Sequence, residues 1–269
     1  VPITLCLTIY AAYSARIMER EILRNMLVTV EMGKDNIDFR MEQIEGNALS
    51  ILSTVYPYLN STTSGPEQLK EYNEVKRLLG EYRAKPMVAK IRLYVPSHKL
   101  YSTQGDFFYS LDELIAMYPN EEDALNALRG NSWVEPHIEA LQFGDPPIYV
   151  LSCQTSITST TDYEHVVGSM FIDVRVADFG EVLSAGIGER ETLFLADRAG
   201  RVLCHADIEQ IGAQALPQQD AAEMAAQQSG SRSIRLDNED YLMVYTRLDS
   251  TDWYLVMTVP RSEVYATGF

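Results

Sequence analysis

The residue types that most often carry catalysis or bind metal are scattered along this chain. No His-x-x-x-His or Cys-x-x-Cys spacing of the kind that binds metal occurs among the cysteines or among His98, His137, His165 and His205. No Gly-x-Ser-x-Gly segment is present to expose a serine nucleophile. The run Gly186-Ile-Gly188 lacks the third glycine and the lysine of a phosphate-binding loop, and we interpret it as a hinge. We therefore expect no catalytic site, no metal site and no cofactor.

Composition indicates a folded, acidic protein. The chain has 269 residues, of which 46% are hydrophobic, and 22 basic against 38 acidic residues give a net charge of −16. This balance argues against nucleic acid and against an anionic membrane surface as partners, and its main consequence is solubility. Cys6 lies in an apolar run, whereas Cys153 and Cys204 lie in expected strands. No disulfide framework is implied, and pairing of Cys153 with Cys204 is left open.

One long helix organises the elements that must position any site. The segment 15–55 contains no proline, and its apolar residues recur about 3.7 residues apart on average, as expected for one face of a helix. We predict a stalk helix over 14–58, roughly 60 Å long at about 1.5 Å per residue. The apolar stripe consists of Ile22, Met26, Val30, Gly33, Ile37, Met41, Ile44, Ala48, Ile51 and Val55.

The segment 1–13 is uncharged and mostly apolar. It is shorter than the about 20 residues that span a bilayer, so we interpret it as the truncated end of a transmembrane helix. The alternative is the core of a signal peptide ending near Ala11-Ala12-Tyr13-Ser14-Ala15. Both interpretations place the rest of the chain outside the membrane.

Two α+β modules with antiparallel sheets are expected after the stalk, over 59–185 and 186–262, before a return toward the membrane over 263–269. In the first, we predict a strand over Val88–Val95 that pairs with Leu100–Thr103, a loop at Trp133 and Pro136, and two long strands over Ile148–Ile157 and His165–Val176. In the second, strands over Thr192–Ala196 and Arg201–His205 flank a turn in which Gly200 supplies positive φ. A helix over Pro217–Gln228 and three further strands complete it.

The order of these elements resembles the double Cache (dCache) sensor domain of bacterial transmembrane receptors, which consists of a long helix followed by two PAS-like modules. The second module carries Leu193-Phe-Leu-Ala-Asp-Arg-Ala-Gly200, then Val202-Leu-Cys-His205, Ile211-Gly212 and Trp253-Tyr-Leu-Val-Met257. The first carries Ile91-Arg-Leu-Tyr-Val95, Trp133 and Gly168-Ser-Met-Phe-Ile-Asp173, similar to YesM-like sensor histidine kinases of Gram-positive bacteria. The resemblance covers nearly the whole chain.

The resemblance implies a ligand pocket in a PAS-like module. Amino-acid-binding dCache domains usually carry Arg-x-Trp-Tyr, a later tyrosine and an aspartate; here Trp133 lacks the arginine and tyrosine, while Tyr149 and Asp173 match. Stacking on Trp133 or Tyr149, with hydroxyls bonded to Asp173, suits a sugar, and YesM-like kinases are often associated with carbohydrate uptake. We also name Tyr94 and Arg92 as ligand residues. Each of these five has a competing structural role in packing, in hydrogen bonding or as a solvated strand residue.

The resemblance further implies an extracellular sensor, cut from a receptor whose output is a histidine kinase of a two-component system, with homodimerisation through the stalk and flanking transmembrane helices. An AraC-like regulator or a chemotaxis receptor is the alternative output. A different class of function is a membrane-anchored interaction module that binds no small molecule. A secreted hydrolase is a weak hypothesis, because no nucleophile and base can be named.

Overall fold

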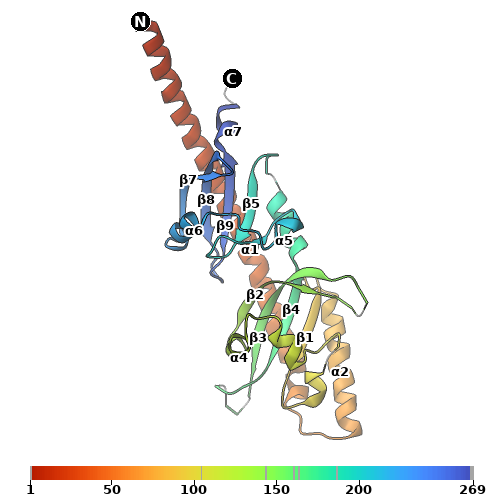
Figure 1. The fold of residues 1–269 in the computed structure, drawn as a ribbon. Helices are drawn as coiled ribbons and strands as arrows, with labels where there is room; N and C mark the ends of the chain where they lie inside the picture. Colours follow the sequence, from red (N-terminus) through yellow and green to blue (C-terminus); the bar gives the residue numbers. More distant parts are fainter. Residues whose placement is uncertain are drawn as a thin grey trace. The chain divides into compact units, whose positions relative to one another are not determined.

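The computed structural model describes residues 2–103, 105–142, 144–159, 161–162, 164–185 and 187–266 (Figure 1). The chain is α+β: a long N-terminal helix precedes two antiparallel sheets, as predicted. Within the described part of the chain, no helix is both long enough and apolar enough to cross a membrane. Part of the expected hinge at Gly186–Gly188 lies outside the described residues, because Gly186 is not among them. The same holds for residues 267–269 of the expected return over 263–269.

Helix α1 spans Pro2–Leu59 and follows the predicted apolar stripe. The stripe residues Val30, Ile37, Ile44, Ile51 and Val55 have no exposed surface, because their spacing places them on one side of the helix. The chain divides into two compact units that both include part of this helix. Unit 1 comprises residues 1–39 and 179–269, and unit 2 comprises residues 40–178.

Unit 2 is built on a four-stranded sheet with the order β1-β4-β3-β2, in which all neighbours are antiparallel. The strands are β1 (Lys90–Tyr94), β2 (Ser132–Glu139), β3 (Ile148–Thr158) and β4 (Val166–Arg175). Three helices accompany them, α2 (Pro66–Arg83), α3 (Leu111–Ile115) and α4 (Glu121–Ala127), together with the 3₁₀ turn η1 (Lys99–Ser102).

Two predicted elements of unit 2 are wrong. The expected returning strand over Leu100–Thr103 is largely the turn η1, and β1 pairs instead with β4, more than seventy positions later in the chain. The expected loop at Trp133 and Pro136 is the edge strand β2. The register of β2 shifts between Val134 and His137, so Pro136 lies where the ladder is interrupted and no hydrogen bond from its nitrogen is needed.

Unit 1 holds a five-stranded antiparallel sheet with the order β6-β5-β9-β8-β7. The strands are β5 (Thr192–Ala196), β6 (Val202–Cys204), β7 (Ser229–Leu236), β8 (Glu239–Arg247) and β9 (Tyr254–Pro260). Its other elements are α5 (Val176–Ser184), which begins in unit 2, η2 (Ile208–Gln210), α6 (Gln218–Ala225) and α7 (Arg261–Ala266). Gly200 has a φ of 79°, as the predicted turn requires.

Both faces of the unit 1 sheet are packed. A Cβ placed on Gly33 of α1 would lie 2.8 Å from Leu255 Cδ2, so the helix lies close to this face of the sheet. The opposite face carries a buried apolar cluster that includes Phe194, Tyr245 and Val256. Met224 of α6 is part of this cluster and packs against that face. In unit 1, side chains therefore fill the space over the sheet face that would line a pocket in a PAS-like module.

Cys153 and Cys204 are both buried thiols that form no disulfide, one in each unit. Burial raises the pKa of each thiol to about 12. Both cysteines therefore act as small core residues.

Candidate functional site

The unit 2 sheet presents two chemically different faces. Pairing aligns Lys90, Asp173, Ser152 and Val134 across the four strands, so that these side chains share one face. Trp133 precedes Val134 on β2, so its side chain lies on the opposite face, where it donates its indole N–H to Glu45 of α1. This opposite face is therefore next to α1. Charged side chains are therefore buried on the face that points away from α1.

Glu139, the last residue of β2, is the centre of this polar face. Its Oε2 lies 2.5 Å from Arg92 Nη2 and 3.4 Å from Lys90 Nζ, and its Oε1 accepts a hydrogen bond of 3.2 Å from Tyr109 Oη. Lys90 also donates to the carbonyl of Ala140. The side chains of Lys90, Arg92 and Glu139 are 3%, 7% and 12% exposed, so this is a buried ion pair network and not a solvated surface.

Arg92 is held by further contacts. Its guanidinium lies over the ring of Tyr109, 4.4 Å from the ring centre, and its Nη1 lies 3.7 Å from Glu113 Oε1. Glu113 itself is fixed at the start of α3, where it forms a capping box with Ser110. The arginine nitrogen Nε is buried and has no hydrogen-bond partner among the described residues.

Asp173 of β4 is fully buried and only half satisfied. Its Oδ1 accepts a hydrogen bond of 2.5 Å from Ser152 Oγ, which also lies 3.3 Å from His137 Nε2. Its Oδ2 is buried and has no partner in the described part of the chain. Burial raises the pKa of Asp173 to about 6, although the charges of His137 and Arg92 oppose this rise.

A hollow of about 350 Å³ opens beside this network. Lys90 and Arg92 line its strand side, and Glu113 of α3 lines it together with Gly105, Asp106, Ala140 and Gln142 from two loops. A void of this size can hold a small molecule of amino-acid or monosaccharide size. We call Lys90, Arg92, Tyr109, Glu139, Asp173 and the hollow next to them the polar site.

The five residues named from the sequence do not come together. Arg92 and Asp173 belong to the polar site, and Tyr94 lies on the same face but packs in a buried cluster with Tyr109, Leu114, Val134 and Phe171. Strand alternation places Trp133 and Tyr149 on the opposite face, toward α1. A ligand role for Trp133 and Tyr149 stays a prediction, and the geometry gives it no support.

Lys90, Tyr109 and Glu139 were not anticipated as site residues. Lys90 and Arg92 are two positions apart on β1, a spacing that places both cations on one face of a strand. That spacing is the signal from which the cationic half of the site could have been found. Glu139 offers no such signal, because its position depends on the register shift in β2 and that strand was expected to be a loop.

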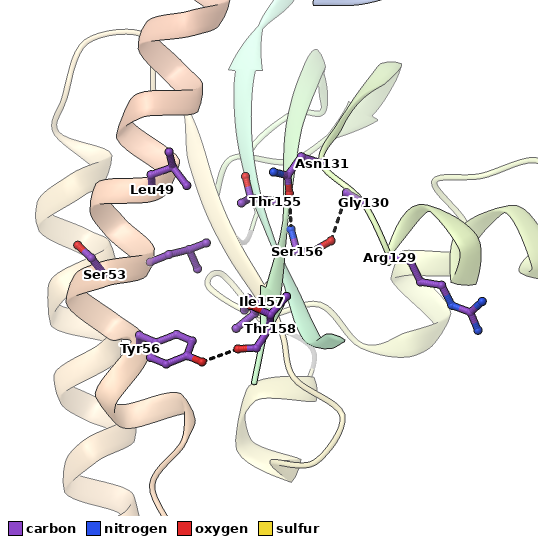
Figure 2. Close-up of a pocket in the computed structure, with 11 residues that line it drawn as sticks. Leu49, Ser53, Tyr56, Arg129, Gly130, Asn131, Thr155, Ser156, Ile157 and Thr158 are labelled. Atoms are coloured by element: carbon purple, nitrogen blue, oxygen red, sulfur yellow. Dashed lines mark hydrogen bonds between the residues drawn. The ribbon is translucent and has the colours of Figure 1, made fainter. Parts of the chain in front are cut away.

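A second hollow, of about 470 Å³, lies on the other side of the unit 2 sheet, between α1 and the end of β3 (Figure 2). Two of its polar groups are already paired: Tyr56 Oη donates to the carbonyl of Thr158, and the backbone N–H of Ser156 donates to Asn131 Oδ1. Arg129 points away from the hollow in Figure 2. Among the described residues, none of the buried polar atoms without a partner lines this hollow, so the polar site is the better candidate.

A long helix followed by two antiparallel α+β units is the architecture of tandem PAS-like sensor domains. The chain belongs to the Cache domain family, because the dCache_1 profile, described as a Cache domain, matches residues 14–267. Double Cache domains are extracellular sensor domains of membrane receptors. The chain is thus a sensory domain of the Cache type.

Similar solved structures include the sensory and ligand-binding domains of chemoreceptors. The periplasmic sensory domain of the Campylobacter jejuni chemoreceptor Tlp1 is 14% identical with a TM-score of 0.71, over 92% of this chain and 98% of that one. The ligand-binding domain of Mlp24 with asparagine is 18% identical with a TM-score of 0.64, over 94% and 98%. That of the Pseudomonas aeruginosa PAO1 amino acid chemoreceptor PctB in complex with L-Arg is 16% identical with a TM-score of 0.63, over 92% and 98%. No curated protein matches the chain.

Proposed function

We propose that this chain is the extracytoplasmic sensing domain of a transmembrane receptor and that it binds a small polar molecule at the polar site of unit 2. One observation carries the proposal: the buried cations Lys90 and Arg92 line a hollow, and directly across from Lys90 on the same sheet face Asp173 Oδ2 is buried without a hydrogen-bond donor among the described residues. A buried acceptor without a donor is costly, and a ligand amine or hydroxyl would remove that cost. The second face of the unit 1 sheet is instead covered by a buried apolar cluster that includes Phe194, Tyr245 and Val256.

The ligand class follows from the donor that Asp173 needs. An amino acid supplies an ammonium group, and two of the similar solved structures are of ligand-binding domains with asparagine and with L-Arg. A carbohydrate supplies hydroxyl groups, but the aromatic residues expected to stack against it lie on the opposite face. Amines and amino acids are therefore our first ligand class, and carbohydrates are the second.

The output of the receptor lies outside this domain. A histidine kinase of the YesM-like type of Gram-positive bacteria is one proposal, drawn from the motifs of the first module. A chemotaxis receptor is a second proposal, and an AraC-like regulator is a third. The division into a membrane-distal module over 59–185 and a membrane-proximal module over 186–262 is part of the same proposal. A kinase His box, a methylated coiled coil or a helix-turn-helix in the sequence that follows would identify the output.

We further propose that the receptor pairs through α1. In unit 1, Val28, Met32 and Phe39 are 49%, 68% and 59% exposed, and their spacing places them on the side of the helix opposite the buried stripe. Phe39→Glu should shift an otherwise dimeric receptor toward monomer in a cross-linking assay, whereas Asp35→Asn on the same exposed side should not. Equal cross-linking of both variants would overturn pairing through α1.

The test of the sensing function is a thermal-shift and calorimetric screen against amino acids, amines and mono- and oligosaccharides, using the wild-type protein and Asp173→Asn. A ligand at 100 times its dissociation constant stabilises the folded state by about 2.7 kcal/mol, which is readily measured. We expect a ligand whose effect is lost in Asp173→Asn while the ligand-free fold stays intact. A ligand unaffected by this change would place the site elsewhere, and a screen with no response would favour an interaction module.

A further inference from the structure

The polar site contains a complete binding place for a carboxylate. Three donors converge on the position of one carboxylate group: Lys90 Nζ, Arg92 Nη2 and Tyr109 Oη. Together they supply two positive charges and a hydroxyl donor. Arg92 and Lys90 are almost fully buried, so their charges are not screened by water. We call these three side chains the carboxylate cradle.

The carboxylate in the cradle comes from the chain itself. Glu139 places its Oε2 toward both cations and its Oε1 toward Tyr109. It is the last residue of the edge strand, and the residues that follow it, Ala140 and Gln142, line the hollow. The internal carboxylate therefore lies beside the space that a ligand would enter.

The charges around the hollow show what remains for a ligand. The two cations Lys90 and Arg92 are matched by Glu139 and by Glu113, which lies 3.7 Å from Arg92. Asp173 remains, with one oxygen that has no donor in the described part of the chain. An acidic group would find Lys90 Nζ, Arg92 Nη2 and Tyr109 Oη already engaged by Glu139 and would meet the negative charge of Asp173, whereas a donor group would find an acceptor without a partner among the described residues.

We propose that Glu139 is the specificity-determining residue of the polar site: by filling the carboxylate cradle it excludes the acidic group of a ligand and leaves Asp173 as the group that selects an amine or hydroxyl. This inference rests on the proposed function, since it assumes that the ligand binds at this site. It narrows the ligand class further, because an amine without a carboxylate needs no place in the cradle. An α-amino acid can bind only with its carboxylate directed away from the cradle.

Removal of Glu139 provides a direct test that requires no knowledge of the natural ligand. Glu139→Ala leaves two buried cations without their carboxylate and a space the size of the lost group, so a small free carboxylate should bind there. The probes are acetate and formate, with acetamide as a neutral molecule of the same shape as acetate and sodium chloride as the ionic-strength control. Glu122→Ala is the matched control variant, because Glu122 is an exposed carboxylate on α4 of the same unit.

We expect acetate and formate to raise the melting temperature of Glu139→Ala in a saturable manner, with half-saturation at least ten-fold below that of acetamide. The wild-type protein and Glu122→Ala should show only the response to sodium chloride. An equal response of the wild type to acetate would show that the cradle is open, and no response of Glu139→Ala would show that the cradle does not bind a free carboxylate. Either result would overturn the proposal.

Two further measurements keep the test decisive if Glu139→Ala folds poorly. Refolding in acetate, but not in acetamide or sodium chloride, should then restore the native circular dichroism spectrum, and failure in all three would count against the proposal. Glu139→Gln keeps the side-chain shape but removes its negative charge. The ratio of the affinity for 1,5-diaminopentane to the affinity for glutarate should be at least ten-fold lower in this variant than in the wild type. The acetate result depends only on the cradle, so it can succeed or fail independently of the sensing function.

Discussion

The indole nitrogen of Trp133 donates a 2.9 Å hydrogen bond to Glu45 Oε1, which links the edge strand β2 to helix α1 within unit 2. The sequence suggested Trp133 as a stacking surface for a ligand, yet its polar atom is used within the fold. The polar site lies on the other face of the same sheet. Trp133 therefore belongs to the residues that hold α1 against the sheet, whereas the residues that face the hollow lie on the other face.

Replacing Trp133 by Phe should therefore affect stability more than ligand binding. The loss of a hydrogen bond to a charged group should reduce the free energy of unfolding by about 1 to 3 kcal/mol. Urea denaturation measures this loss, and Glu45→Gln, which retains an acceptor oxygen, should cost less. If Trp133→Phe abolished ligand binding without changing stability, Trp133 would belong to the ligand site after all.

Asp173 should make unfolding depend on pH between about 4 and 6. Burial raises its native pKa from 3.8 to about 6, so the native state holds a proton in this range that the unfolded state releases. The stability that Asp173 contributes is thus greatest below its unfolded pKa and falls as the pH rises toward its native pKa. Asp173→Asn removes this effect.

The measurement is chemical denaturation of the wild type and of Asp173→Asn at several pH values. From pH 4 to pH 7 the free energy of unfolding of the variant should increase relative to that of the wild type by up to about 3 kcal/mol. A constant difference between the two proteins would show that Asp173 does not titrate in this range. Other carboxylates shared by both proteins cancel in the comparison.

Gly168 and Gly46 should respond oppositely to alanine. A Cβ on Gly168 would lie 2.4 Å from the carbonyl oxygen of Tyr94, a backbone atom that cannot move away without disturbing β1, and a cost of about 1 to 3 kcal/mol follows. A Cβ on Gly46 of α1 meets no atom within 4 Å, so Gly46→Ala should stabilise by about 0.5 to 1 kcal/mol. Thermal unfolding of both variants checks this difference, and a shift of the same sign in both would contradict it.

Asp38 should contribute to the packing of α1 in unit 1. It is 6% exposed, lies 2.9 Å from Lys34 Nζ, and accepts the backbone N–H of Asp249 at 3.2 Å. Asp38→Ala should cost about 2 kcal/mol, because it leaves a part-buried lysine and a backbone donor without this acceptor. Asp35→Ala, at an exposed position of the same helix, is the control, and an equal effect of both changes in urea denaturation would argue against a specific role.

Much of the fold followed from local signals. The stripe from Ile22 to Val55 predicted the long helix, because a period near 3.6 residues has only one structural meaning over so many turns. The strands of unit 1 and the positive φ of Gly200 also agreed with their local sequence. These features depend on neighbours in the chain, and they place it in its family.

Tertiary structure decided the site. β1 pairs with β4 and not with the nearby Leu100–Thr103, and that distant pairing brings Lys90 and Arg92 onto the face that carries Asp173. The register shift in β2 then places Glu139 against both cations. Sequence alone identified Asp173 and Arg92 as polar residues of interest. It could not show that a carboxylate thirty-four positions before Asp173 fills the cradle, because strand register is set by packing between segments that are far apart in the chain.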